Sequence, residues 1–362
     1  MVFNYLKKVD WVIIVSALLL VAFGLLSIYS SSLSSGDFLN FEKQIIFLGI
    51  GIFLMFLVSF FDYRILRNDP YLILLFYFFS LLFLAGLFYF APEIRGVKSW
   101  YKLGPFSFDP IELTKLVLII LLAKYFSMRH IEMYRIRHIL LSGIYVALPS
   151  VLIFFQPDLG SVLILIALWV GVLLISGIKI RHFLILCLAG LLLFALSWSF
   201  LLRDYQKDRI LSFVSPQMEP LGAGWSQIQA KIAVGAGGIF GQGLGQGSQT
   251  QYGFLSEPQT DFIFASIAEE FGMLGVLILF FLFLILIWRI IKIGIASQTN
   301  FPRLFASGLA IILVAQIFIN IGMNLGFLPI IGISLPLVSY GGSGLIMTLI
   351  GLAILENIKV NS

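Results

Sequence analysis

Cysteine and histidine are almost absent from this chain of 362 residues. Cys187 is the only cysteine and lies in an apolar run, which excludes an internal disulfide and a cysteine-ligated metal site. The three histidines, His130, His138 and His182, all lie in short basic segments. Their positions argue against a histidine-ligated metal and against a histidine general base.

Charged residues are scarce as well. They make up 11% of the chain, hydrophobic residues make up 60%, and the mean hydropathy is +1.04. These values exclude an ordinary soluble protein and are typical of a polytopic membrane protein. The net charge of +5 is better explained by topology signals beside membrane helices than by nucleic acid binding, so we expect no nucleic acid partner.

About ten apolar runs follow one another along the chain, each close to the ~20 residues that a membrane-spanning helix needs. They cover roughly 11–31, 45–61, 71–91, 111–127, 139–156, 159–177, 183–202, 271–291, 304–326 and 341–358. We predict an all-α polytopic membrane protein of about ten transmembrane helices, forming a single domain over residues 1–362. A cleaved signal peptide is the alternative interpretation of the first run, but its length favours an uncleaved helix.

The distribution of basic residues predicts the orientation. An even number of helices places both termini on one side of the membrane. Cytoplasmic loops of membrane proteins carry an excess of Lys and Arg. With the N-terminus in the cytoplasm, most Lys and Arg residues outside the long polar segments lie in or beside such loops. These residues are Lys7, Lys8, Arg64, Arg67, Arg129, Arg135, Arg137, Lys179, Arg181, Arg289, Lys292 and Arg303. The large polar loop between the seventh and eighth helices, over 203–261, is then extracytoplasmic.

The longest polar interruption, residues 203–272, is the candidate catalytic region. Asp261 opens an apolar run within it, and an isolated Asp at that position is most simply a helix N-cap. Its charged neighbours favour chemistry instead, because a carboxylate can accept a proton while cations hold a diphosphate leaving group. The acids are Asp204, Asp208, Glu219, Glu257, Asp261, Glu269 and Glu270, and the cations are Arg203, Lys207, Arg209 and Lys231.

Two further interpretations of this region concern cofactors. Two or three of the acids could hold a divalent cation, Mg²⁺ or Mn²⁺, although no spacing specifies a metal site. The glycine-rich run 241–247 lacks the spacing and the preceding strand of a nucleotide-binding loop, so neither ATP nor NAD is expected. The substrate must therefore carry its own energy, which points to an activated lipid donor such as a polyprenyl diphosphate sugar. We expect the glycines to allow close backbone approach in a loop buried by protein.

Polar residues near other outer helix ends have both a structural and a functional interpretation. Asp109, Pro110 and Glu112 form a capping-box pattern, and Lys115 lies three residues after Glu112 on the same helix face. A charge inside a spanning helix is costly unless it is paired, so we predict a Glu112–Lys115 pair that faces a cavity and leave open whether Lys115 also touches an anionic substrate.

Two outer turns carry the same ambiguity. Asp158, in the turn 156–160, either caps the next helix or binds substrate. Ser339, Tyr340 and Ser343, in the loop 335–344, either line the cavity or satisfy loop backbone.

Several motifs together resemble the SEDS family (shape, elongation, division and sporulation), over essentially the whole chain. They are Asp204-Tyr-Gln-Lys-Asp-Arg-Ile, Glu219-Pro-Leu-Gly-Ala-Gly-Trp, Gln229-Ala-Lys-Ile-Ala-Val-Gly-Ala-Gly-Gly, Gly247-Ser-Gln-Thr-Gln, Thr260-Asp-Phe-Ile-Phe-Ala-Ser-Ile-Ala-Glu-Glu-Phe-Gly272, Gln156-Pro-Asp-Leu-Gly160, Asn320-Ile-Gly-Met-Asn324 and Leu335-Pro-Leu-Val-Ser-Tyr-Gly-Gly-Ser343. Within the family, Gln249-Thr-Gln251 and Ala268-Glu-Glu look more like RodA than FtsW. The chain departs from the family pattern at Asp109-Pro-Ile-Glu112, at Ser99 and at Leu255-Ser-Glu257-Pro258.

The resemblance implies a ten-helix glycosyltransferase of the bacterial cytoplasmic membrane that polymerises lipid II into peptidoglycan strands for cell elongation and shape. It also implies a class B penicillin-binding protein as partner, and Asp261 falls on the family's catalytic acidic position. We predict an inverting transfer with Asp261 as general base and undecaprenyl diphosphate as leaving group. The expected substrate-binding residues are Lys115, Glu112, Asp158, Arg209, Lys231, Gln227 and Ser339.

Two other functions remain open at this stage. One is a lipid II flippase, since many helices with intramembrane charges also suit a translocation path. The other is a non-catalytic scaffold of the cell-wall machinery. A flippase needs polar groups along the full membrane depth, whereas nearly all the unusual charges here are expected toward the outer side.

Overall fold

The fold comes from a computed structural model, which describes residues 8–58, 60–92, 99–104, 106–128, 136–200, 202, 204–214 and 223–361. Ten long helices dominate the described residues, in agreement with the prediction. They are α2 (Trp11–Ser35), α3 (Leu39–Val58), α5 (Pro70–Phe90), α6 (Pro110–Ser127), α7 (Ile136–Phe155), α8 (Leu159–Ile175), α9 (Ile180–Phe200), α13 (Ile263–Ala296), α14 (Asn300–Leu325) and α15 (Gly342–Asn361).

Eight of these helices are long and apolar enough to cross a membrane. The other two are α8, with 17 residues, and α6, which carries Glu112, Lys115 and Lys124. Apolar runs form helices in hydrocarbon because a helix satisfies all its backbone hydrogen bonds internally. The predicted all-α polytopic class is therefore confirmed.

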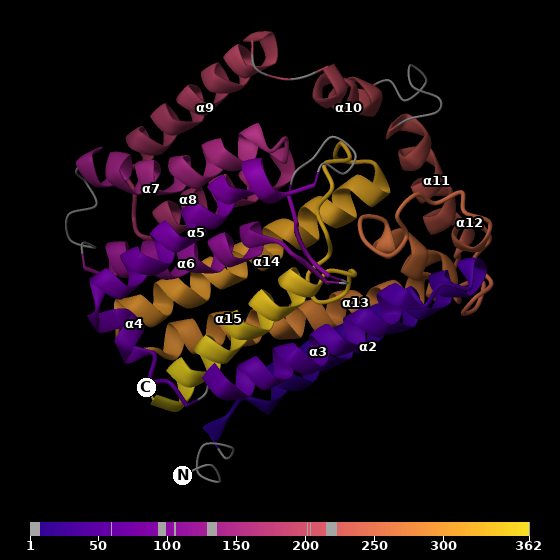
Figure 1. Ribbon diagram of the computed structural model, residues 1–362, viewed down its shortest axis with the longest axis horizontal. Helices are drawn as coiled ribbons and strands as arrows, with labels where there is room; N and C mark the ends of the chain where they lie inside the picture. Colours follow the sequence, from indigo (N-terminus) through magenta and orange to yellow (C-terminus); the bar gives the residue numbers. More distant parts are fainter. Residues whose placement is uncertain are drawn as a thin grey trace.

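The helices are not equally buried. In the most apolar stretch of α14, 67% of the residues are buried inside the molecule, whereas in that of α9 no residue is buried. Figure 1 shows α14 running through the middle of the bundle and α9 at its periphery. Thus α14 provides the rigid core from which a site can be positioned, whereas α9 presents its apolar side chains outward.

The two ends of the bundle differ. The start of α2, the end of α15 and the short helix α4 (Arg64–Asn68) lie at one end, called the terminal end below (Figure 1). The helices of the predicted polar loop, α10 (Asp204–Val214), α11 (Ala223–Ala236) and α12 (Ser248–Gln251), lie at the opposite end, called the loop end (Figure 1). The loop therefore contains helices of its own.

A short hairpin precedes α6 and was not predicted. Strand β1 (Tyr101–Leu103) pairs antiparallel with β2 (Phe106–Phe108). Asp109 then caps α6, accepting a hydrogen bond from the Ile111 amide at 2.8 Å, with Pro110 at the first helical position as predicted. The prediction that Glu112 completes a capping box is wrong. The Asp109 amide donates to Ser343 Oγ at 2.9 Å, and Glu112 accepts a hydrogen bond from Lys115.

Helix α13 begins earlier than predicted and is broken at Gly272, whose φ of 63° and ψ of −163° are not helical. At the break, the glycine-rich segment supplies the missing backbone partners. The amides of Gln242 and Gly243 donate to the carbonyls of Glu269 and Glu270, both at 3.0 Å. On the other side of the break, Met273 and Leu274 donate to the carbonyls of residues 238 and 239. The glycine-rich loop is therefore packed onto a broken membrane helix, as the close-approach hypothesis required.

Candidate active site

Asp261 lies at the loop end, two residues before α13, and is half-buried. Its backbone carbonyl accepts hydrogen bonds from the side-chain amides of Asn320 and Asn324, both at 3.0 Å. The N-cap residue of α13 is Phe262, and its own side chain makes no capping hydrogen bond. Asp261 is therefore not the N-cap residue of α13, and the N-cap interpretation is wrong.

The two asparagines hold Asp261 from α14. Both are fully buried and stand four residues apart, so they lie on one face of the helix. Asn324 Oδ1 also accepts the Ala265 amide at 3.1 Å, and Asn320 Nδ2 donates to the Ile333 carbonyl at 2.7 Å. This clamp ties the backbone at Asp261 and at Ala265 to α14, and Asn320 also holds the loop that follows α14.

The sequence prediction did not include these asparagines among the site residues. The spacing of the two asparagines could have indicated them. Burying two side-chain amides four residues apart in a spanning helix costs free energy unless they have hydrogen-bond partners.

The loop between α14 and α15 forms a second wall. Ser339 Oγ donates to the Thr260 carbonyl at 2.7 Å and accepts the Leu335 amide at 2.8 Å. The Tyr340 amide donates to the Gln259 carbonyl at 2.8 Å. Ser339 therefore satisfies loop backbone and ties it to the residue before Asp261. Gly332 faces Asp261 directly, since a Cβ at that position would lie 3.7 Å from Asp261 Oδ2.

Helix α11 contributes the predicted residues Gln227 and Lys231. Gln227 is buried and donates to the Leu328 carbonyl at 3.1 Å, so it holds the same inter-helix loop. The exposed Lys231 lays its stem on Gly326, where a Cβ would approach Lys231 Cε to 1.9 Å. A cation is thus held at the edge of the loop that faces Asp261.

The predicted Glu112–Lys115 pair is present. Lys115 Nζ lies 2.6 Å from Glu112 Oε1, and the two side chains are 5% and 17% exposed. Gly344 faces the pair, because a Cβ there would lie 3.6 Å from Glu112 Cδ. Residues 339–344, which join the end of this loop to the first turn of α15, therefore contact both the neighbour of Asp261 and the Glu112–Lys115 pair.

Two further acids lie beside this pair. Asp158 caps α8 through the Ser161 amide at 3.0 Å, as the structural interpretation required. Burial raises the pKa of Asp158, against hydrogen bonds from Ser161 and the charge of Lys115. Burial also raises the pKa of Asp109 well above its usual value, and the neighbouring Glu112 charge adds to the effect. Lys115 is thus the cation in a cluster of three acids.

Other predicted acids serve the loop instead of the site. Glu269 is fully buried and accepts hydrogen bonds from the Gln249 amide at 2.7 Å, the Thr250 amide at 3.1 Å and the hydroxyls of Ser248 and Thr250. Glu270 accepts from Ser30 Oγ and Gln251 Nε2. Their inclusion in a reactive cluster is therefore wrong: they anchor α12 and the glycine-rich segment to α13 and α2.

The predicted cluster also included residues of α10 and of the segments beside it. Arg209 is half-buried on α10, which packs on α11. Arg203, Glu219 and the side chain of Asp204 lie outside the described residues. Among the described residues, no three His, Cys, Asp or Glu side chains form a group that could hold a metal ion. The divalent cation, Mg²⁺ or Mn²⁺, stays a prediction, because two of the acids offered for it, Asp204 and Glu219, have side chains outside the described residues.

Comparison with known proteins decides the family. The FtsW/RodA/SpoVE model, described as a cell cycle protein, matches residues 10–362. This chain belongs to that family. The family assignment confirms the resemblance that the motifs of the sequence indicated.

Curated members of the family match nearly the full length. The chain is 35% identical to peptidoglycan glycosyltransferase MrdB of Escherichia coli (strain K12) over 362 residues, which cover 98% of this chain and 96% of that protein. It is 35% identical to stage V sporulation protein E of Bacillus subtilis (strain 168) over 361 residues, 97% of this chain and 96% of that protein.

Solved structures of the family share the fold. A chain of a peptidoglycan synthase complex, in which polymerization and crosslinking are coordinated, has a TM-score of 0.84 at 32% identity and covers 98% of both chains. The rod shape determining protein RodA of Thermus thermophilus has a TM-score of 0.73 at 31% identity, covering 97% of this chain and 96% of that chain.

Proposed function

We propose that this chain is a peptidoglycan glycosyltransferase that joins lipid II disaccharide units into glycan strands for cell elongation and shape. The observation that carries the proposal is a half-buried carboxylate, Asp261, whose backbone is clamped by two buried asparagines in a chain 35% identical to a peptidoglycan glycosyltransferase. A general base must be held in place while remaining open to substrate, and this arrangement meets both needs.

In the proposed reaction, Asp261 removes the proton from the acceptor sugar hydroxyl as that oxygen attacks the anomeric carbon of the donor. The bond to undecaprenyl diphosphate breaks and the configuration inverts. Lys231, at the rim of the facing loop, suits the diphosphate leaving group, with Arg209 on the adjoining helix α10 as a further cation. Lys115, held by Glu112 with Asp158 nearby, suits an anionic part of the second lipid-linked substrate.

The active site is proposed to face outward. Arg64 contacts the last turn of α15, Lys124 donates to the Arg67 carbonyl, and both Arg289 and Lys359 pair with Asp10. These contacts gather basic residues at the terminal end, and cytoplasmic ends collect Lys and Arg. Both termini are then cytoplasmic, in the bacterial cytoplasmic membrane, and the loop end with Asp261 is extracytoplasmic.

The position of buried charge favours the transferase over the flippase. Among the described residues, buried carboxylates and ammonium groups lie near the loop end (Lys115, Glu269, Glu270) and at the terminal end (Asp10, Glu356). The second group was not predicted from the sequence. Burial raises the pKa of Asp10, but hydrogen bonds and charges from Arg289 and Lys359 outweigh it and leave the pKa lowered. A translocation path would require buried charges between these two groups as well. Among the described residues, no buried carboxylate or ammonium group lies there.

The partner proposed for the chain is a class B penicillin-binding protein. Support comes from the similar chain that forms part of a peptidoglycan synthase complex with coupled polymerization and crosslinking. A polymerase that works beside a transpeptidase would deliver its strand directly for crosslinking.

The test is the substitution Asp261→Asn, assayed by gel for polymer made from lipid II by the purified protein with its partner. Asn keeps the size of the side chain but cannot accept the proton, so we expect at least a ~100-fold loss of polymerisation with partner binding intact. Glu257→Gln, at an exposed acid in the same loop, is the matched control and should retain activity. Near-normal activity of Asp261→Asn would disprove the assigned base.

A further inference from the structure

A cavity of about 600 Å³ opens between α2, α3 and α15 at the terminal end. Helix α3 packs mainly on α15 and α2 mainly on α13, so the first two helices diverge and leave room between them. The proposed active site lies at the opposite end of the bundle (Figure 1). This cavity is therefore not part of the glycosyltransferase site.

The deeper part of the cavity is apolar. It is lined by Ile13 and Ala17 of α2, Ile52 and Met55 of α3, and Leu349 and Leu352 of α15. Helix α15 advances about 10 Å between Leu349 and Glu356, which is roughly two thirds of the ~15 Å hydrocarbon depth of one leaflet. The space therefore matches much of the length of a lipid acyl chain entering from the terminal end.

Glu356 lines this cavity and is only 2% exposed. Its Oε2 accepts the Asp10 amide at 2.8 Å, whereas its Oε1 has no hydrogen-bond partner among the described residues. An unpartnered buried carboxylate oxygen is costly, and a donor from a ligand would remove that cost. Because a carboxylate accepts hydrogen bonds, the matching ligand group is a donor, best a cationic one.

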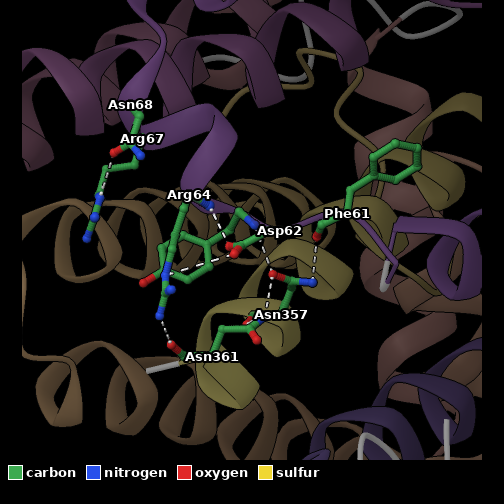
Figure 2. Close-up of polar contacts among 8 residues, drawn as sticks. Phe61, Asp62, Arg64, Arg67, Asn68, Asn357 and Asn361 are labelled. Atoms are coloured by element: carbon green, nitrogen blue, oxygen red, sulfur yellow. Dashed lines mark hydrogen bonds and ion pairs between the residues drawn. The ribbon is translucent and has the colours of Figure 1, made fainter. Parts of the chain in front are cut away.

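The mouth of the cavity offers both signs of charge. Asp62, Asn357 and Asn361 line it, together with the aromatic Trp11. Figure 2 shows Arg64 beside Asp62 and Asn361: its Nη2 donates to the Asn361 carbonyl at 2.9 Å, and its Nε lies 4.0 Å from Asp62 Oδ2. The Asn357 side chain fixes the rim by accepting the Tyr63 amide at 3.0 Å and donating to the Phe61 carbonyl at 2.7 Å (Figure 2).

We propose that this cavity binds a phospholipid with a primary ammonium headgroup, of the phosphatidylethanolamine class, from the leaflet at the terminal end. One acyl chain fills the apolar part, and the ammonium group donates to Glu356 Oε1 and to Asp62. The phosphate faces the Arg64 guanidinium, a favourable partner for phosphate oxygens. An anionic headgroup without an amine fits less well, because it brings no cation to Glu356 and Asp62, the two carboxylates that line the cavity.

Native mass spectrometry of the full chain in detergent tests the headgroup. Phosphatidylethanolamine, its N-trimethylated analogue phosphatidylcholine, and phosphatidylglycerol are added with identical acyl chains, and the affinity for the tightest lipid is measured. Methylation keeps the positive charge but removes every N–H donor. We expect about tenfold tighter retention of phosphatidylethanolamine than of the other two lipids, the value of roughly one charge-assisted hydrogen bond. Equal retention of the three lipids, or preference for phosphatidylglycerol, would overturn the proposal.

Two pairs of variants locate the lipid. Ile52→Trp fills the cavity and should weaken phosphatidylethanolamine retention about tenfold, whereas Ile46→Trp, at an equally exposed isoleucine of α3 outside the cavity, should not. Asp62→Asn should reduce the headgroup preference, whereas Asp69→Asn, at a cap outside the cavity, should not. If both tryptophan variants behave like the unmodified chain, the lipid does not occupy this cavity and the proposal fails.

Discussion

At the scale of single residues, the candidate base depends on two side chains of α14 that are themselves fully buried. Asn320 and Asn324 together direct their amide groups to one carbonyl, that of Asp261. Polar side chains inside a membrane helix persist where they have partners and a task. Here the task is to hold the backbone of the candidate base against α14, a largely buried helix of the bundle.

Removal of one asparagine should therefore damage catalysis. Asn324→Ala takes a donor from the Asp261 carbonyl and leaves the Ala265 amide without its acceptor. We expect a stability loss of about 1–3 kcal/mol, seen as a lower melting temperature, and at least a tenfold lower kcat for polymerisation with little change in KM. Gln316→Ala, at a buried amide two turns earlier on α14, is the control. Equal kcat losses in both variants would indicate general damage to α14.

The buried ion pair also makes a prediction at this scale. Lys115 and Glu112 are in contact at 2.6 Å, so removing one partner strands the other charge at a cost of roughly 3–5 kcal/mol if the site is dry. Glu112→Leu and Lys115→Met should each lower the melting temperature more than the double variant does. Mild, additive effects would show that the two side chains are not coupled.

The same variants separate structure from substrate binding. If the double variant melts like the unmodified chain but makes no polymer from lipid II, the pair contacts substrate. If it folds and polymerises normally, the pair serves only to bring a lysine into the membrane domain at low cost.

At the scale of elements, the break in α13 couples the glycine-rich loop to the membrane domain. Four backbone hydrogen bonds cross between residues 238–243 and the two sides of Gly272. The carboxylates of Glu269 and Glu270 then hold the loop residues 248–251 from the same helix. The same helix thus begins two residues after Asp261 and anchors the glycine-rich loop at its break.

Gly272→Ala should disrupt this arrangement. A Cβ at Gly272 would lie 2.3 Å from the Gly241 amide nitrogen, and the φ of 63° disfavours any L-residue with a side chain. We expect a loss of about 3 kcal/mol or more in stability, measured as a lower melting temperature, together with loss of polymerisation.

The matched control is Gly190→Ala in α9, where no atom lies within 4 Å of the added methyl group. It should melt like the unmodified chain. A Gly272→Ala variant as stable as this control would mean that α13 can continue as a regular helix and that the break is not required.

At the scale of the whole molecule, α9 and α10 are less firmly packed than the core. Helix α9 has no buried residue, and α10 follows it directly in the chain. Their position is therefore set by few internal contacts, and a protein that binds the loop end in one arrangement would favour that arrangement to the extent that it binds it more tightly.

We therefore expect the class B penicillin-binding protein to raise the rate of polymerisation by about 5- to 150-fold, the fold-change that typical coupling free energies between two sites produce. The measurement compares lipid II polymerisation by the purified chain alone, with the partner, and with a partner whose transpeptidase serine is removed. Stimulation by the inactive partner would support activation through structure. Full activity of the isolated chain would contradict the prediction.

The sequence alone determined the membrane domain. The predicted runs 111–127 and 341–358 agree with α6 and α15 to within a few residues, and the total of ten long helices in the described residues matches the prediction. The physical reason is local: hydrocarbon compels each apolar segment to satisfy its own backbone, so hydropathy and length suffice to predict a helix. The Glu112–Lys115 pair was predictable for the same reason, because the helix repeat brings residues three apart together.

Only the tertiary structure decided which polar groups form the site. In the sequence, Glu269 and Glu270 resembled reactive acids as closely as Asp261 did, yet the fold buries them among loop amides and leaves Asp261 half-open. Asn324 reaches Asp261 across 63 residues of chain, and Ser343 reaches Asp109 across 234. Such contacts depend on how the helices pack side by side, and neither the spacing nor the hydropathy of the sequence specifies that packing.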